Sequence, residues 1–325
     1  MQMRYDTRSV HPLDRYDYYR AASATELAPV SIQGQAPGRL LAAMSAATIG
    51  DIELEHVTWS ADSRLVTRRT ERLIRAHDPE CYRIVLGISG VMVGGQAGSQ
   101  VTVRPGDIVL FDLSRPCSAL NGTDSRVLRT VMLSVPRALV PITYTEIRPL
   151  TGTLVPRTLP GRNLLAQLLI GLVTPTAPAP DPNLADVLRE SVTGLIRRRL
   201  GHASGIGPHT RRTLWMHHLH NLIRQHLGDP TFNTRQLARI ANISTRFLHA
   251  LCQDAGHTPV RLIKQLRLEE CHRSLRNPAF ATRPIKDIAA THGYTRPDQF
   301  ARDFKQHFGV SATQARTLAD GPGQE

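Results

Sequence analysis

One short pattern occurs twice between residues 232 and 308, and no other feature of the chain limits its fold as strongly. In each copy a small residue, Ala238 or Ala289, is followed by a turn residue, Asn242 or Gly293. The small residue allows two helices to cross closely, and the turn residue tolerates a positive φ. The pattern therefore predicts two helix-turn-helix units, and their repetition makes DNA binding the leading hypothesis.

Further residues predict where the helices of this region begin and how they are held. Apolar positions that would anchor the second helix of each unit are Leu248 with Leu251, and Phe300 with Phe304. Two pairs have the spacing of a capping box, namely Asn233 with Gln236 and Thr295 with Asp298. Thr258 followed by Pro259 predicts the N-cap and first residue of a long helix over residues 259–275, which joins the two units.

Composition limits the class of protein. The 325 residues suffice for two domains, and the formal net charge of +13 suits a polyanionic partner. Four cysteines without CxxC spacing predict reduced structural thiols. The longest apolar run, residues 164–173, is far shorter than the roughly 20 residues that span a bilayer. We expect a cytoplasmic, nucleoid-associated protein with no cofactor, no metal and no membrane partner.

The segment from residue 51 to residue 135 has β character. Short apolar segments separated by Gly-Gly, Pro-Gly-Asp and Asn-Gly turns predict a sandwich or a small barrel, which can enclose one small ligand. Because His56 shares a strand face with Ile52 and Leu54, we expect it inside the barrel, either as an effector contact or as a hydrogen-bonded core histidine. Trp59, on the opposite strand face, is a second candidate effector contact.

The pattern becomes helical after residue 156. Residues 163–173 and 184–200 are amphipathic, and the apolar stripe of the second segment packs either on its own barrel or on a second subunit. Residues 201–208, GHASGIGP, are typical of a flexible linker. The predicted domains are a regulatory domain over 1–158, a helical dimerisation segment over 159–203, a DNA-binding domain over 208–318 and a disordered tail over 319–325.

The repeated region resembles the DNA-binding domain of the AraC/XylS family of transcriptional regulators. The resemblance covers residues 209–316 and lies in IANISTRFLHAL, GHTPVRLIKQLRLEEC and PIKDIAATHGYTRPDQFARDFKQHFGVS. The family usually has proline after the closing serine, where this chain has Ala312. The N-terminal half resembles the cupin-like effector domain of the family in its strand count and in the turn VRPGDIVLFD. It lacks the His-x-His of metal-binding cupins, so an enzyme is not expected.

The predicted fold is therefore a multidomain α+β structure. It combines an N-terminal cupin-like β-barrel with flanking helices and a C-terminal all-α domain with two helix-turn-helix motifs joined by a long helix. At 100° per residue, the outward faces of the two recognition helices carry Arg246, His249, Ala250 and Gln253, and Asp298, Gln299, Arg302, Lys305 and Gln306. By resemblance the base-reading positions are Arg246, His249 and Ala250 in the first helix, and Asp298, Gln299 and Arg302 in the second.

These features predict a sequence-specific transcriptional regulator, an activator, that responds to a small-molecule effector. Its expected partners are double-stranded promoter DNA, RNA polymerase, an effector of unknown identity and a second copy of the chain. In the alternative, the β domain binds no ligand, and a protein partner or the abundance of the protein controls regulation.

Overall fold

The computed structural model describes six segments of the chain: residues 1–34, 40–60, 65–121, 127–174, 184–201 and 207–317. The contacts divide it into two compact units, Met1–Leu214 and Trp215–Glu325. The division falls inside the helix α6, Pro208–Gln225. The predicted tail at 319–325, most of the predicted linker and most of the Pro-rich segment before residue 184 lie outside the described residues.

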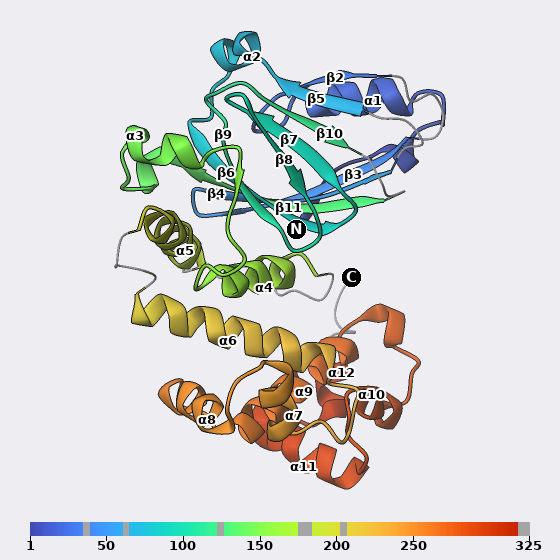
Figure 1. Ribbon diagram of the computed structural model, residues 1–325. Helices are drawn as coiled ribbons and strands as arrows, with labels where there is room; N and C mark the ends of the chain where they lie inside the picture. Colours follow the sequence, from blue (N-terminus) through green and yellow to red (C-terminus); the bar gives the residue numbers. More distant parts are fainter. Residues whose placement is uncertain (35–39, 61–64, 122–126, 175–183, 202–206, 318–325) are drawn as a thin grey trace. The chain divides into compact units, whose positions relative to one another are not determined.

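The first unit contains two antiparallel sheets (Figure 1). The seven-stranded sheet has the order β1 (Gln2–Asp6), β3 (Leu41–Ile49), β4 (Ile52–Ser60), β11 (Leu128–Pro136), β6 (Cys81–Ser89), β9 (Ile108–Asp112) and β12 (Thr153–Leu154). The five-stranded sheet has the order β2 (Ser31–Gln33), β5 (Leu65–Arg69), β10 (Cys117–Asn121), β7 (Met92–Gln96) and β8 (Ser99–Val103). Helices α1 (Arg15–Ser23), α2 (Glu71–Ala76) and α3 (Tyr144–Ile147) lie in the connections.

The prediction of a closed barrel is corrected by this topology. Within the described segments, no strand of one sheet is paired with a strand of the other. The edge strand β12 has two residues, and both are paired with β9, so the ladder ends there. Turn residues that separate short strands are compatible with a barrel and with stacked sheets, which is why the sequence pattern did not distinguish them.

Both faces of the seven-stranded sheet are buried. On one face, Ile52 and Leu54 of β4 pack in an apolar cluster with helices α4 (Arg162–Leu172) and α5 (Leu184–Arg199), which run beneath the sheet in Figure 1. On the other face, Trp59 of β4 packs in a second cluster with residues of the five-stranded sheet such as Leu65. The first unit therefore has three layers: helices, sheet and sheet.

Helix α5 resolves an alternative that the sequence left open. Its apolar stripe, which includes Leu188, Val192 and Leu195, is buried in the cluster beneath its own sheet. Of the residues of α5, only Asp186 is exposed. The stripe therefore packs within its own subunit rather than against a second one.

The second unit is entirely helical in its described part. Its helices after α6 are α7 (Thr234–Ile240), α8 (Thr245–Asp254), α9 (Pro259–Leu275), α10 (Ile285–Thr291), α11 (Pro297–Phe308) and α12 (Ala312–Thr317). Leu262 and Leu266 of α9 pack with α7 and α8, whereas Leu268 and Leu275 pack with α10, α11 and α12. The predicted long helix is confirmed, and it carries one small core at each end. No described helix of the chain is both long and apolar enough to cross a bilayer.

Candidate nucleic-acid interface and effector cavity

The turns of the two helix pairs have the same geometry. Asn242 has φ 54°, and the next residue, Ile243, donates its N–H to Ala238 O over 3.0 Å. Gly293 has φ 83°, and Tyr294 donates to Ala289 O over 3.1 Å. The positive φ expected at both turn positions is confirmed, and each bond satisfies a carbonyl at the end of the first helix.

Gly293 is required for a second reason. A Cβ atom at this position would lie 2.4 Å from the carbonyl oxygen of Leu227. This oxygen belongs to the backbone, so it cannot be displaced without shifting the chain. By contrast, the equivalent position in the first pair is Asn242, which accommodates a side chain in the left-handed region.

The helix starts confirm most of the predicted caps. Asn233 and Gln236 form a capping box at α7, and Thr258 accepts a hydrogen bond from Arg261 N at the start of α9. A cap that the sequence analysis missed is Ser244, whose hydroxyl accepts from Phe247 N over 3.1 Å at the start of α8. The signal was present, because serine is a strongly preferred N-cap residue.

The capping box predicted for Thr295 and Asp298 is wrong. The N-cap of α11 is Arg296, and no side chain caps this helix. Instead, Asp298 accepts a hydrogen bond from Arg296 over 2.9 Å and lies 3.5 Å from Nη2 of Arg302. The bond from Arg296 is the main reason that the pKa of Asp298 lies below its usual range. Two arginines therefore compete for this carboxylate, which a local capping pattern does not reveal.

The predicted DNA contacts lie on two exposed helix faces. On α8, Leu248 is buried, while Arg246, His249, Ala250 and Gln253 are exposed. On α11, Phe300 and Phe304 are buried, while Asp298, Gln299, Arg302, Lys305 and Gln306 are exposed. Sequence reasoning omitted Arg296, whose side chain is 67% exposed beside Asp298. Each face thus presents hydrogen-bonding and cationic groups on a rigid helix.

An ion pair fixes α11 on the long helix. Lys264 of α9 contacts Asp303 of α11 over 2.6 Å, and Asp303 is largely buried. Arg267 of α9 donates to the carbonyl oxygen of Asp229 over 2.7 Å. The pair of Lys264 and Asp303 orients the exposed face of α11 within the second unit, and the bond from Arg267 joins α9 to the loop before α7.

Helix α6 carries a group of three histidines in its middle. His217, His218 and His220 are all half-buried. Burial lowers the pKa of His218, and burial with nearby Arg224 and His217 lowers the pKa of His220 to about 4. His220 is therefore neutral at pH 7. In the described segments, no cluster of three or more His, Cys, Asp and Glu residues has the arrangement of a metal site.

A cavity of about 160 Å³ lies between the two sheets of the first unit. Its walls include the apolar residues Met44, Val57, Trp59, Val85, Met92, Phe111, Ala119, Leu128 and Met132. They also include the polar residues Tyr5, Tyr19, Glu26, Glu55, Arg69, Arg83 and Thr130. The cavity is thus apolar with a few converging polar groups, as small-molecule sites usually are.

The structure corrects the placement of His56. The cavity is lined by Glu55, Val57 and Trp59, which occupy one face of β4, whereas His56 is not among the lining residues. Because alternate residues of a strand point to opposite faces, His56 lies on the side of Ile52 and Leu54, toward the helical layer. Trp59 lines the cavity, and its role as an effector contact stays a prediction.

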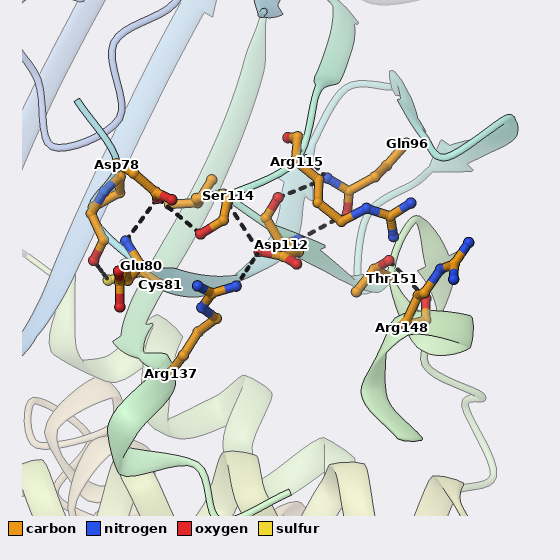
Figure 2. Close-up of polar contacts among 12 residues, drawn as sticks. Asp78, Glu80, Cys81, Gln96, Asp112, Ser114, Arg115, Arg137, Arg148 and Thr151 are labelled. Atoms are coloured by element: carbon orange, nitrogen blue, oxygen red, sulfur yellow. Dashed lines mark hydrogen bonds and ion pairs between the residues drawn. The ribbon is translucent and has the colours of Figure 1, made fainter. Parts of the chain in front are cut away.

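Polar contacts connect the two sheets next to this cavity (Figure 2). Gln96 of β7 donates to Asp112 O over 2.8 Å and accepts from Asp112 N over 2.9 Å, at the end of β9. Ser114 N donates to Oδ1 of Asp112 over 3.0 Å, and Arg137 lies 3.9 Å from the same oxygen. Burial raises the pKa of the Asp112 carboxyl. Gln96 thus pairs with the backbone of the opposite sheet as a strand would.

Two family models match the chain. An AraC-binding-like domain matches residues 19–228, and a helix-turn-helix domain matches residues 237–317. The first match covers most of the chain and contains every lining residue of the cavity except Tyr5. The second match contains α8 and α11. The chain therefore belongs to the AraC/XylS family of transcriptional regulators, whose members are DNA-binding regulators and not enzymes.

The chain is also similar to individual proteins. The transcriptional activator NphR of Rhodococcus sp is 24% identical over 272 residues, which are 81% of this chain and 76% of NphR. The probable thc operon regulatory protein of Rhodococcus erythropolis is 32% identical over 93 residues, which are 28% of each chain. The crystal structure of the AraC-like transcriptional activator CuxR aligns with 88% of this chain and 99% of CuxR, at 16% identity and a TM-score of 0.43.

Proposed function

We propose that this protein activates transcription at promoters that it binds sequence-specifically, under the control of a small-molecule effector. The observation that carries the proposal is the repeated geometry of the second unit. Two helix pairs with matching turns each present an exposed polar face, on α8 and on α11. The activator role rests on NphR, a relative that is named as a transcriptional activator.

In this proposal the exposed faces of α8 and α11 read base edges in the major groove. Arg246 and Arg302 have the side chain that forks onto O6 and N7 of guanine, and Gln299 has the amide that pairs with adenine. Lys305 and Gln306 lie further along α11 and suit phosphate contacts. Arg296 joins them as a cation beside Asp298.

The two helices would enter successive major grooves, about 34 Å apart along one face of the duplex. The 17-residue helix α9 is a spacer of about 26 Å at 1.5 Å per residue, and its two cores hold the helix pairs at its ends. One subunit would then cover about two helical turns. A homodimer would require two such sites.

The cavity supports the effector part of the proposal. All of its lining residues except Tyr5 lie in the region that matches the AraC-binding-like domain, and it combines apolar walls with converging polar groups. In the alternative, a protein partner controls the first unit. A thermal-shift screen of the full chain against small-molecule fractions of a cell extract, combined with a pull-down, separates the two. Protection by a small-molecule fraction supports the effector, whereas recovery of a specific protein without any such protection supports the partner.

Selection of random duplex DNA by the full-length protein tests the DNA-binding part. We expect a defined sequence to be enriched, and its affinity to fall when Arg246 and Arg302 are both changed to alanine. A matched control combines Arg72→Ala with Arg75→Ala, which removes the same two charges from exposed positions in α2 of the first unit. Retention of DNA without any sequence preference would contradict the proposal.

A further inference from the structure

Trp59 has a hydrogen-bonding capacity that its surroundings do not use. The side chain lines the cavity and is only 1% exposed, yet its Nε1 has no hydrogen-bond partner among the described residues. Buried donors are nearly always paired, and leaving one unpaired is costly. A molecule in the cavity that carries an acceptor would complete the hydrogen bonding of Trp59.

The size and the walls of the cavity limit what fits. Its volume is about 160 Å³, and an apolar cavity of about 150 Å³ holds one benzene molecule in another protein. Phe111 and three methionines, Met44, Met92 and Met132, contribute to the walls. Aromatic rings and thioether sulfurs both make favourable contacts with an aromatic ring. These features favour a molecule with a single ring.

The charges of the walls favour a neutral molecule. The charged lining residues are Glu26, Glu55, Arg69 and Arg83, so their formal charges sum to zero. Arg83 and Glu55 form an ion pair of 3.0 Å. Arg69 donates all three of its guanidinium nitrogens to backbone carbonyl oxygens, those of Leu113, Pro29 and His77. Every guanidinium nitrogen of Arg83 also donates already, to Ser134, Met132 or Glu55. An anionic ligand would therefore lose its hydration without gaining a free guanidinium nitrogen.

We infer that the cavity takes a small, neutral, single-ring aromatic compound with one hydrogen-bond acceptor, which accepts from Nε1 of Trp59. The inference rests on the proposed effector function and names the ligand class of that site. Trp59 is then the residue that distinguishes an acceptor-bearing ligand from a hydrocarbon of the same shape.

Three probes test the ligand class with the full-length protein by calorimetry. Acetophenone carries the acceptor, α-methylstyrene has the same shape without it, and benzoate is the ionised counterpart. We expect acetophenone to bind about fivefold to tenfold more tightly than α-methylstyrene, as one hydrogen bond to an unsatisfied donor allows. Benzoate should bind at least tenfold more weakly than acetophenone. Equal affinities for acetophenone and α-methylstyrene, or tighter binding of benzoate, would overturn the inference.

Two variants locate the interaction. Trp59→Phe removes the donor and keeps an aromatic ring, so the preference for acetophenone should disappear. Ala119→Leu fills part of the cavity from β10 and should weaken both neutral probes. The inference is wrong if Trp59→Phe still prefers acetophenone over α-methylstyrene. It is also wrong if Ala119→Leu binds both neutral probes as tightly as the wild type, because the probes would then bind elsewhere.

Indole resonances give a readout that does not depend on the folding of Trp59→Phe. The chain has two tryptophans, so Trp215→Phe assigns the two indole N–H signals. Acetophenone should shift the Trp59 signal downfield, and α-methylstyrene should not. The same preparation is used for the DNA selection, so the two hypotheses fail separately. Enrichment of a DNA sequence without the indole shift would reject the ligand class alone, whereas the absence of enrichment would reject the proposed function.

Discussion

Gly293 shows how one residue sets the geometry of a helix pair. Its φ of 83° and the Leu227 carbonyl oxygen, 2.4 Å from the site of a Cβ, leave no room for a side chain. We expect Gly293→Ala to destabilise the second unit by about 2–5 kcal/mol, from left-handed strain and steric overlap together. Gly256→Ala is the matched control, because Gly256 has φ 76° and no atom near the position of a Cβ. Gly256→Ala should lower the free energy of unfolding by about 1–2 kcal/mol. Urea unfolding measures both variants. Equal losses in the free energy of unfolding would contradict the prediction, because they would mean that the overlap with Leu227 adds no cost.

His220 makes the second unit sensitive to acid. Burial and nearby cations lower its pKa to about 4, below the value of about 6.5 in an unfolded chain. The unfolded state therefore binds more protons between these values, and stability falls as pH falls from about 6.5 to about 4. Between pH 7 and pH 5, the free energy of unfolding of His220→Gln should fall by roughly 1–2 kcal/mol less than that of the wild type. The exposed His249→Gln is the control. Equal pH dependence in His220→Gln and the wild type would assign the acid sensitivity to other groups.

At the scale of elements, the outcome of the sequence predictions depended on how local each signal was. The turns at Asn242 and Gly293 and the cap at Thr258 involve only neighbouring residues, and all three were predicted. The face of β4 that meets the cavity was not predictable in this way. Period-two alternation separates His56 from Trp59, but both faces of the strand are buried, and only the packing of distant helices shows which face meets α5. The closed barrel failed for a similar reason, since closure depends on contacts between strands far apart in sequence.

Gln96 connects two elements of different sheets, and its loss should be measurable. Gln96→Ala leaves the N–H and the carbonyl of the buried Asp112 without their partner. We expect the first unit to lose about 1–3 kcal/mol, the cost of unsatisfied buried groups. Gln100→Ala on β8 removes an equal side chain from an exposed position and should be nearly neutral. Chemical denaturation measures both variants, and an equal loss in the free energy of unfolding would argue against a bridging role for Gln96.

For the whole molecule, the two units have separate apolar cores, which suggests that they fold independently. The second unit retains two clusters of its own, at the two ends of α9. A fragment of residues 205–325 contains all of α6 and should be helical and bind the selected DNA without an effector. Circular dichroism and a gel-shift assay check this prediction. An unfolded fragment would show that the second unit depends on the first.

The central claim is that α8 and α11 read two adjacent major grooves. Selection of random DNA by Arg246→Ala and by Arg302→Ala, each compared with the wild type, tests it directly. Each variant should cost about 1–3 kcal/mol at its preferred site and relax the preference at one position only. The two relaxed positions should lie about one helical turn apart. Relaxation at the same position, or a uniform loss of affinity for every sequence with a shallower salt dependence, would contradict the account.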